Sequence, residues 1–506
     1  MAELPVDDIT RFIGRYSIGR DSNPLETMGS LHFLRVKVPG GYITSSQLRG
    51  VADVAEKYGR GQGEITDRQD IQLHWINAED TLEIFPAMEK LGFTTDMCGQ
   101  GFAGPEYGDV RNVVCCPASG IERDELIDVR PLLNRLSDYF IGNQEFYNMP
   151  RKFKVSISAC QSDCTRAVVD DLALVAVRKA DKVGFTLLAG GSVGVSLPGP
   201  RLARPLGVFA LPEEAFDVVV AVVKIHRDYG SRESKAKARF KWLLETWGAE
   251  KLKKVLEEKL GRTLDEYEGP VFQRDDTHTR MQPQKQSGHY YVNVPILGGR
   301  LTSKEMVLFA DLADEYGDGD LRLTPRQNLI IANIKEKEAL LRRLEQEGFP
   351  LKGSWMRWNS VGCASDFCGK TVSPHCKEML KETVDRLENR FDERLLNEAR
   401  LRMHVSGCPN NCCAKEIAAI GLSGFLTRED GETRQSYDIL LGGEFGTTAT
   451  MGRLIEARVP AGEVPAKIEA LLTNYLAKRR GSEGLSDFCN RHTVEELRAY
   501  LSTKEG

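Results

Sequence analysis

The chain contains one of its own segments twice, and this repeat constrains the fold more than any other sequence feature. Residues 40–76 read GGYITSSQLRGVADVAEKYGRGQGEITDRQDIQLHWI, and residues 298–334 read GGRLTSKEMVLFADLADEYGDGDLRLTPRQNLIIANI. The two segments align without gaps at an offset of 258 residues, and 14 of the 37 aligned positions are identical. Solenoid repeats have periods of about 20–50 residues, so this longer period indicates a duplicated domain.

Each copy predicts the element order β-α-β. A strand ends at a Gly-Gly pair, and apolar residues at helical spacing then predict an amphipathic helix. In the first copy its apolar face is formed by Leu48, Val51, Ala52 and Ala55. A glycine turn follows, and residues 65–76 predict a strand. Helical patterns come next, at residues 82–91 and 337–346, so each copy is expected to form a ferredoxin-like half-domain.

Weaker similarity continues beyond the two copies. Residues 110–120, VRNVVCCPASG, resemble residues 357–367, RWNSVGCASDF. Residues 153–164, FKVSISACQSDC, resemble residues 401–412, LRMHVSGCPNNC. The whole chain therefore has the pattern of two fused halves.

Composition is that of a globular protein and excludes several classes. The 506 residues are 41% hydrophobic and 28% charged, which argues against a disordered or fibrous chain. A net charge of -5 argues against bulk nucleic-acid binding. The N-terminal MAELPVDDITRF does not resemble a signal peptide, and no stretch approaches the ~18 apolar residues that span a bilayer. We therefore expect a cytoplasmic protein without a membrane partner, whose 12 cysteines serve metal ligation, catalysis or burial rather than disulfides.

Four cysteines of the second half are spaced for a metal centre. Cys363 and Cys368 form one pair, and Cys408 and Cys412, inside SGCPNNC, form another. Four soft thiolates suit either zinc or an iron–sulfur cluster. Zinc ribbons usually use tighter CxxC pairs, whereas the wider Cys-x3-Cys loop offers backbone N–H groups that can hydrogen-bond to cluster sulfides. The alternative interpretation is four buried, apolar thiols.

The motifs around these cysteines carry a resemblance to a known family. RMHVSGCPNNC followed by IAAIGLSG, the upstream RWNSVGC, and the segments EITDRQDIQLHWI and RDYGSRESKAKARFKWL resemble the sirohaem-dependent sulfite and nitrite reductases. The likeness covers nearly the whole chain and is greatest to the ferredoxin-dependent assimilatory type. It implies a sirohaem and a [4Fe-4S] cluster held by Cys363, Cys368, Cys408 and Cys412. By the same resemblance, Cys412 bridges the cluster to the sirohaem iron as its axial thiolate.

One spacing departs from the family pattern. The family usually places five residues between the first two cysteines, whereas CASDFC has four. The register of RWNSVG identifies Cys363 as the first ligand, so Cys368 is the natural second. Cys376 and Cys413 are the available substitutes.

The repeat and the resemblance together predict an α+β fold of two fused pseudo-repeats. Ferredoxin-like half-domains are expected to alternate with two α+β domains that bind sirohaem and the [4Fe-4S] cluster. The expected ranges are 15–85 and 285–348 for the half-domains, 86–284 for the first sirohaem and substrate domain, and 349–506 for the second sirohaem and cluster domain. Candidate linkers are the polar stretch 273–287 and the helical, charged region 227–262, which closes the first half.

Reduction of sulfite at a haem iron requires a cationic cavity, because a dianion must be bound and its oxygens protonated as water leaves. Three separate segments supply the cations Arg35, Arg111, Lys152 and Lys154. Alternation in RKFKVSIS puts the two lysines on one face of a strand and Phe153 on the other. A solvated strand face is the alternative, but the resemblance assigns all four cations to positions where the family binds its substrate anion.

Lys154 bears on the choice of substrate. Sequences resembling sulfite reductases carry a second lysine here, whereas many resembling nitrite reductases carry asparagine, as in RKFN or RKWN. The added positive charge suits a dianion better than monoanionic nitrite. The sequence therefore favours sulfite, with nitrite as the alternative.

Sirohaem carries eight carboxylates, so its site should be rich in arginine, lysine, glutamine and backbone N–H groups. Arg68, Gln72 and His74 are predicted to alternate on one face of the first copy's last strand and match the family's cofactor-binding face. Further candidates are Arg232, Arg239, Lys241 and, in the second copy, Arg326. Gln72 and His74 are replaced by isoleucine and alanine in the second copy, which indicates that one of two pseudo-equivalent sites is used. A core histidine is the alternative for His74.

Two smaller features remain open. The first half has Cys115, Cys116, Cys160 and Cys164 at positions that echo the cluster loops, so they form either a second metal site or buried thiols. Some family members link a tyrosine to a cysteine beside the pocket, and Tyr16 and Cys98 lie in roughly the corresponding segments.

The expected activity is reduction of sulfite to sulfide by six electrons, or of nitrite to ammonia at the same centre. An external ferredoxin or flavoprotein would pass single electrons to the cluster and through Cys412 to the sirohaem, because the chain has no Rossmann glycine fingerprint or flavin module. A zinc-stabilised, non-enzymatic binding protein is one alternative, and it would be colourless. A cobalt-corrinoid biosynthetic monooxygenase is another, and it would require oxygen.

Overall fold

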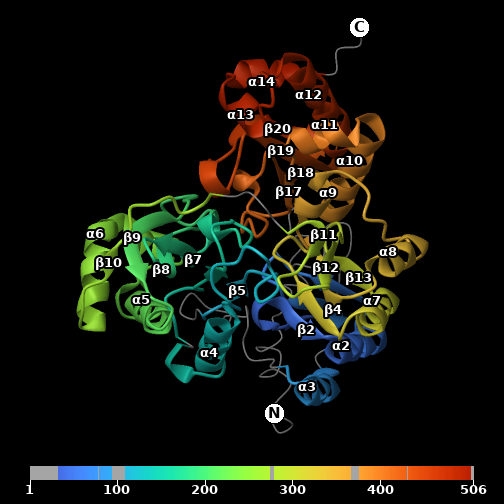
Figure 1. Ribbon diagram of the computed structural model, residues 1–506. Helices are drawn as coiled ribbons and strands as arrows, with labels where there is room; N and C mark the ends of the chain where they lie inside the picture. The colour runs from blue at the N-terminus through green and yellow to red at the C-terminus, as the bar shows by residue number, and fades with distance from the viewer. Residues whose placement is uncertain are drawn as a thin grey trace.

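The structure, a computed structural model, describes residues 32–77, 79–93, 109–146, 148–273, 278–365, 375–429 and 431–502. The predictions for Tyr16, Cys98 and Cys368 lie outside these residues. Four sheets organise the described chain. Two belong to the repeated segments, blue and yellow in Figure 1, and the other two form the green and the orange-red lobes.

The repeated sequence forms a repeated structure. The first copy comprises β1 (His32–Val36), β2 (Tyr42–Thr44), α2 (Ser45–Tyr58), β3 (Gln62–Ile65), β4 (Ile71–Ile76) and α3 (Thr81–Lys90). The second comprises β12 (Tyr290–Val294), β13 (Arg300–Thr302), α7 (Ser303–Tyr316), β14 (Asp320–Leu323), β15 (Leu329–Ile334) and α8 (Lys337–Gln346). α2 and α7 begin with the same capping box, formed by Thr44 with Gln47 and by Thr302 with Glu305. The predicted helices and the α+β class are confirmed.

The single strand predicted for residues 65–76 is wrong, because the chain reverses inside it. β3 and β4 pair as an antiparallel hairpin. The Thr66 hydroxyl accepts hydrogen bonds from the backbone N–H groups of Arg68 and Asp70, at 3.2 and 3.1 Å, and these bonds stabilise the turn. Arg68 therefore lies in the turn and not on a strand face with Gln72 and His74.

Each copy gives one short strand to the sheet of the other. β2 of the first copy pairs with β14, and β13 of the second copy pairs with β3. Gly41 and Gly299 lead into the exchanged strands with φ of 79° and 75°. A Cβ atom at these glycines would lie 2.3 Å from the Leu323 carbonyl oxygen and 2.4 Å from that of Ile65, so only glycine fits. As a result, one hydrophobic core spans both copies.

The two larger sheets share one topology, in which three parallel strands continue into antiparallel ones. The first contains β5 (Val114–Cys115), β6 (Val155–Ser158), β7 (Leu172–Lys179), β8 (Lys182–Ala189), β9 (Arg204–Ala210) and β10 (Asp265–Glu266). The second contains β16 (Val361–Gly362), β17 (Met403–Ser406), β18 (Ile420–Glu429), β19 (Glu432–Leu441) and β20 (Arg453–Pro460). This match supports the prediction of two fused halves, while the exact domain boundaries stay a prediction.

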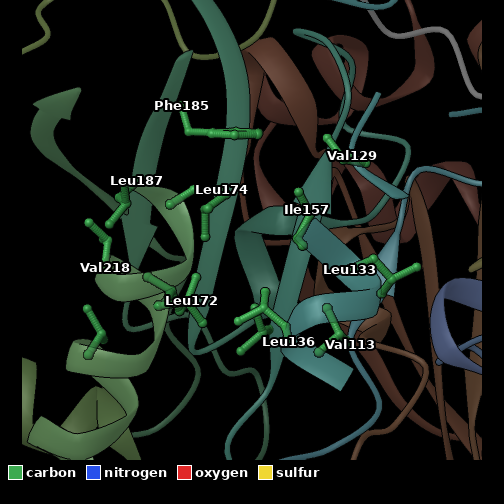
Figure 2. Packing of buried hydrophobic residues seen from close by; sticks show 14 of the residues in the cluster. Val113, Val129, Leu133, Leu136, Ile157, Leu172, Leu174, Phe185, Leu187 and Val218 are labelled. Carbon is green, nitrogen blue, oxygen red and sulfur yellow. The ribbon is translucent and has the colours of Figure 1, made fainter. Parts of the chain in front are cut away.

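Helices cover the larger sheets and bury their apolar faces. The first sheet carries α4 (Arg130–Phe140), α5 (Ala215–Tyr229) and α6 (Phe240–Leu260). The second lobe contains α9 (Trp355–Asn359), α10 (Cys376–Arg390), α11 (Glu393–Glu398), α12 (Val464–Lys478), α13 (Leu485–Asn490) and α14 (Val494–Tyr500). In Figure 2, Leu133 and Leu136 of α4 and Val218 of α5 contribute to the core beside strand residues such as Ile157 and Leu174. This core holds the cavity-facing ends of β5 and β6 in place.

The stretch 273–287, predicted as a linker, is only partly one. Its residues 280–283 form β11 (Arg280–Pro283), which pairs with β12 at the edge of the second copy's sheet. His278, just before β11, has 2% of its surface exposed. Within the described part of the chain, no helix is long and apolar enough to cross a membrane.

Candidate functional site

A cationic cavity of about 240 Å³ lies where the first ferredoxin-like copy, the first large sheet and the loop after β17 meet. Its cationic lining residues are Arg35, Arg68, Arg111, Lys152, Lys154, Arg166 and Arg239. The carboxylates in the lining are Asp67, Asp70 and Asp170, and Cys412 lines the same cavity. A larger and shallower hollow of about 930 Å³ lies beside β10, but it brings together no comparable set of like charges.

Local structure explains how distant residues reach this cavity. Arg35 comes from β1, Arg68 from the turn after β3, and Arg111 from the segment before β5. Lys152 and Lys154 precede β6 in an extended segment and both line the cavity. Phe153 between them is fully buried in the core beneath. The alternation expected from RKFKVSIS is therefore present.

Hydrogen bonds hold several of these cations in place. Arg35 Nη2 donates to Gln72 Oε1 at 2.9 Å. Arg68 Nη1 donates to Asp170 Oδ1 at 3.0 Å, and Arg111 Nη1 donates to Asp109 Oδ2 at 3.1 Å. These side chains form the rim of the cavity, which is fixed before any ligand enters.

The electrostatics of the cavity favour an anionic occupant. Burial, and then repulsion from Arg239, lower the pKa of Lys152 to about 7. Burial also lowers the pKa of Lys154, against the attraction of Asp170. Within the described chain, the buried Nε atoms of Arg68 and Arg239 have no hydrogen-bond partner. A group with several carboxylates would supply both the acceptors and the negative charge, so the donor set fits sirohaem.

Of the predicted cluster cysteines that the structure describes, Cys412 lines the cavity, and the other two lie in the same lobe. Cys363 follows β16, and Cys408 and Cys412 follow β17. Cys363 and Cys408 are buried, whereas the Cys412 side chain is exposed and lines the cavity. A hydrogen bond with Cys413 lowers the pKa of Cys363 to about 7. Soft thiols that lie beside a cationic cavity suit a [4Fe-4S] cluster adjoining an anionic macrocycle.

Five of the seven predicted sirohaem-binding residues do not line the cavity: Gln72, His74, Arg232, Lys241 and Arg326. Gln72 does not line the cavity but accepts a hydrogen bond from Arg35, which does. Arg232 is hydrogen-bonded to Asn148, and Lys241 Nζ donates to the backbone carbonyls of Ser192, Gly194 and Gly199. Lys241 thereby shapes the loop at 192–199, of which Gly194 lines the cavity.

Arg326, the counterpart of Arg68 in the second copy, lies in the pseudo-equivalent place. Its guanidinium carbon is 4.3 Å from the centre of the Phe445 ring, and that of Arg402 lies 3.8 Å from the same ring. Both guanidinium groups therefore pack against one aromatic ring. The expectation that one of the two sites is used stays a prediction.

His74 belongs to a buried charge cluster centred on Glu64. Glu64 lies 2.7 Å from Lys377 Nζ, 3.1 Å from Arg300 Nε and 3.2 Å from His74 Nε2. Burial would raise the pKa of Glu64, but these neighbours, Lys377 first, hold it well below its usual value. The cluster joins β3, the exchanged strand β13 and helix α10 of the cluster lobe. His74 is buried in this cluster and does not line the cavity, which favours the interpretation as a core histidine.

We expect Glu64→Ala to lower the free energy of unfolding by about 3 kcal/mol, because removing one partner leaves buried cations uncompensated. Chemical denaturation followed by circular dichroism measures the change. Glu338→Ala is the matched control, since Glu338 is an exposed α8 residue that lies 3.6 Å from Lys337. Equal midpoints for the two variants would contradict the proposed role of Glu64.

Several residues that line the cavity were not predicted from the sequence, and Arg166 and Asn411 are two of them. Arg166 lines the cavity and donates to Asp67 Oδ2 at 2.8 Å. Asn411 also lines it, and its side-chain amide donates to the Val193 carbonyl at 2.8 Å. Both lie two or fewer residues from a cysteine that was considered, and that proximity was the available signal.

Comparisons with known proteins agree with this geometry. The family model described as "Nitrite and sulphite reductase 4Fe-4S domain" matches residues 106–264 and 370–506. The model described as "Nitrite/Sulfite reductase ferredoxin-like half domain" matches residues 23–91 and 282–346. Each of the two family models therefore matches once in each half of the chain.

Individual relatives cover nearly the whole chain. It is 30% identical to the assimilatory ferredoxin-dependent nitrite reductase of Haloferax mediterranei, over 99% of this chain and 89% of that one. It is also 30% identical to sulfite reductase (ferredoxin) 1 of Mycolicibacterium paratuberculosis, over 94% and 85%. The solved structure of the Mycobacterium tuberculosis NirA protein superposes with a TM-score of 0.85 at 28% identity, covering 93% of this chain and 85% of that one.

The matched domains and the chemistry of the cavity identify the cofactors as sirohaem and a [4Fe-4S] cluster. The alternatives of a non-enzymatic zinc protein and a corrinoid monooxygenase do not fit these matches. The chain belongs to the sirohaem-dependent nitrite and sulfite reductase family.

Proposed function

We propose that this enzyme reduces sulfite to sulfide with six electrons from an external donor. In the balanced reaction, the sulfite dianion takes up six electrons and seven protons and yields the hydrosulfide anion and three waters. The observation that carries the proposal is Lys154, which lines the cavity as an additional cation beside Lys152. A doubly charged oxyanion gains more from this charge than a singly charged one does.

When bound, sirohaem and the cluster would relay the donor's electrons to the substrate. Cys363, Cys408 and Cys412, with Cys368, are the proposed cluster ligands, and Cys412 is the proposed bridge. Arg68 and Arg239 are proposed to bind the carboxylates of the macrocycle, since both line the cavity and retain unpaired Nε–H groups among the described contacts.

The substrate oxygens are proposed to be bound by Arg35, Arg111, Lys152 and Lys154. Arg111 is fixed by Asp109 and offers a planar fork to two oxygens. Lys152, with a pKa of about 7, can hold or release a proton at neutral pH, which suits protonation of a departing oxygen.

A ferredoxin is the proposed donor, because the names of the relatives from Haloferax mediterranei and Mycolicibacterium paratuberculosis both specify one. Nitrite is the second candidate substrate. It is favoured by the names of several relatives, among them the ferredoxin–nitrite reductases of Leptolyngbya laminosa and Oryza sativa.

Lys154→Asn tests the substrate directly. Losing one charge-assisted hydrogen bond is worth about 1.5–3 kcal/mol, so we expect kcat/KM for sulfite to fall about 10- to 100-fold. The value for nitrite should fall much less. Both are measured with reduced methyl viologen as donor, on protein whose sirohaem absorption is unchanged.

Lys182→Asn is the matched control, since Lys182 is an exposed residue of β8 in the same lobe. It should leave both activities unchanged. Equal losses for sulfite and nitrite in Lys154→Asn would remove the case for sulfite.

A further inference from the structure

The first lobe contains a second, separate constellation of metal ligands. Cys116 follows β5, Cys164 lies in the loop after β6, and His278 precedes β11. One ligand atom from each lies within 4.8 Å of the other two. All three residues are buried, with 0%, 3% and 2% of their surfaces exposed. We propose that they bind a structural zinc ion, distinct from the [4Fe-4S] cluster.

The histidine is oriented as metal-binding histidines usually are. Its Nδ1 lies 2.8 Å from Glu122 Oε2, and the Tyr291 hydroxyl donates to the same oxygen at 2.8 Å. Burial would raise the pKa of Glu122, but the His278 hydrogen bond holds it at about 2, so the carboxylate is ionised and accepts the Nδ1 proton. The Nε2 lone pair is thereby directed to Cys116. A carboxylate behind the distal nitrogen is typical of zinc-bound histidines.

The separations fit a single ion. His278 Nε2 lies 3.4 Å from Cys116 Sγ. With Zn–S of about 2.3 Å and Zn–N of about 2.1 Å, a tetrahedral ion separates the two donors by about 3.6 Å. The thiolates of a four-iron cube each bind a different iron and so stand farther apart. The group therefore favours one ion over a second cluster.

The two thiols are hydrogen-bonded to each other, with Cys164 as the donor. A zinc ion would replace the protons of both thiols and bind two thiolate sulfurs.

Cys160 is a further candidate donor, although its Sγ does not belong to the group of atoms that lie within 4.8 Å of one another. It is buried in the same loop as Cys164, and its charge contributes to the raised pKa of that thiol. Two or three sulfurs and one imidazole are a donor set that suits zinc, and full burial suits a structural ion rather than a catalytic one. The ion would tie the ends of β5 and β6 to the segment entering the second ferredoxin-like copy, where Asn293 Nδ2 donates to the His278 carbonyl at 2.9 Å.

The repeat explains how such a site arises. Cys116, Cys160 and Cys164 align with Cys363, Cys408 and Cys412 of the cluster lobe. The first lobe thus keeps three of the thiol positions and adds a histidine from a distant segment. The result is a buried site with fewer thiols, which suits a single divalent ion.

The test uses holoenzyme purified from zinc-supplemented medium, with zinc and iron measured separately. We expect about one zinc per chain in the wild type and little in Cys116→Ser and His278→Ala. Cys115→Ser is the matched control, because Cys115 is the adjacent buried cysteine but its Sγ lies 3.9 Å from the Tyr42 hydroxyl and is not in the group. It should keep its zinc.

Zinc-edge X-ray absorption on the wild type provides a readout that needs no variant to fold. We expect two or three sulfur neighbours at about 2.3 Å and one nitrogen at about 2.1 Å. Wild-type protein without stoichiometric zinc, zinc with no sulfur neighbour, or zinc retained in full by His278→Ala would each overturn the proposal.

Discussion

Replacing Cys412 with serine is expected to lower viologen-driven sulfite turnover by at least about 100-fold. Mutating a residue that only hydrogen-bonds to a metal ligand typically lowers metal affinity or activity by about 10- to 100-fold. Cys412 is proposed as a direct ligand shared by two centres, so its replacement should cost more. A serine hydroxyl stays protonated at neutral pH and is a poor ligand for iron in a sulfur environment. The Cys412 side chain lines the cavity, so its replacement acts directly at the site.

The control for this variant is Cys489→Ser. Cys489 is buried in α13, and burial raises its pKa to about 12, so it is a neutral thiol. Its variant tests whether cysteine-to-serine replacement alone disturbs the cluster lobe, and it should retain visible absorption and turnover. Near-normal turnover in Cys412→Ser would exclude the bridging role, whatever the control shows.

Replacing Lys152 with methionine is expected to lower kcat/KM by about 100- to 10,000-fold, the range for removing a general acid. Methionine keeps the length of the side chain and deletes its charge and protons. Lys152→Arg separates the two roles, because arginine keeps the charge but does not release its proton. We therefore expect Lys152→Arg to retain a near-normal KM with a lowered kcat.

Lys179→Met provides the surface comparison. Lys179 is 38% exposed in its side chain and pairs with Asp265 at 3.2 Å on the outside of the same sheet. It should have wild-type kinetics. If Lys152→Met has the same kinetics as Lys179→Met, Lys152 takes no part in binding or proton delivery.

Much of the fold was predictable from the repeat. The helical spacing of the apolar residues and the offset of 258 residues predicted α2 and α7. The hairpin between β3 and β4 was not recognised, because TDRQD lacks the glycine pair that usually marks a tight reversal. The exchange of β2 and β13 was equally hidden, since a strand's pattern indicates its buried face but not which sheet it joins.

The site residues that lie in recognisable sequence motifs were predictable. Arg35, Arg111, Lys152 and Lys154 come from three segments, and the structure brings them to one cavity. His278 had no such signal. It lies 114 residues beyond Cys164 in a polar stretch, and only tertiary structure brings the two together.

Beside the exchanged strands, equivalent residues of the two copies make equivalent hydrogen bonds to the opposite copy. The Ser45 N–H donates to the Gly319 carbonyl and the Ser303 N–H to the Gly61 carbonyl, both at 2.9 Å. The Ser45 hydroxyl likewise donates to Asp314, and that of Ser303 donates to Glu56, the residue equivalent to Asp314.

In a twofold-symmetric homodimer, each contact between two positions occurs twice, once in each direction across the interface. The two copies therefore contact each other within one polypeptide as the subunits of such a dimer do. Because the copies belong to one chain, a substitution in one is not repeated in the other, and Arg68 of the first copy lines the cationic cavity while its counterpart Arg326 packs on Phe445.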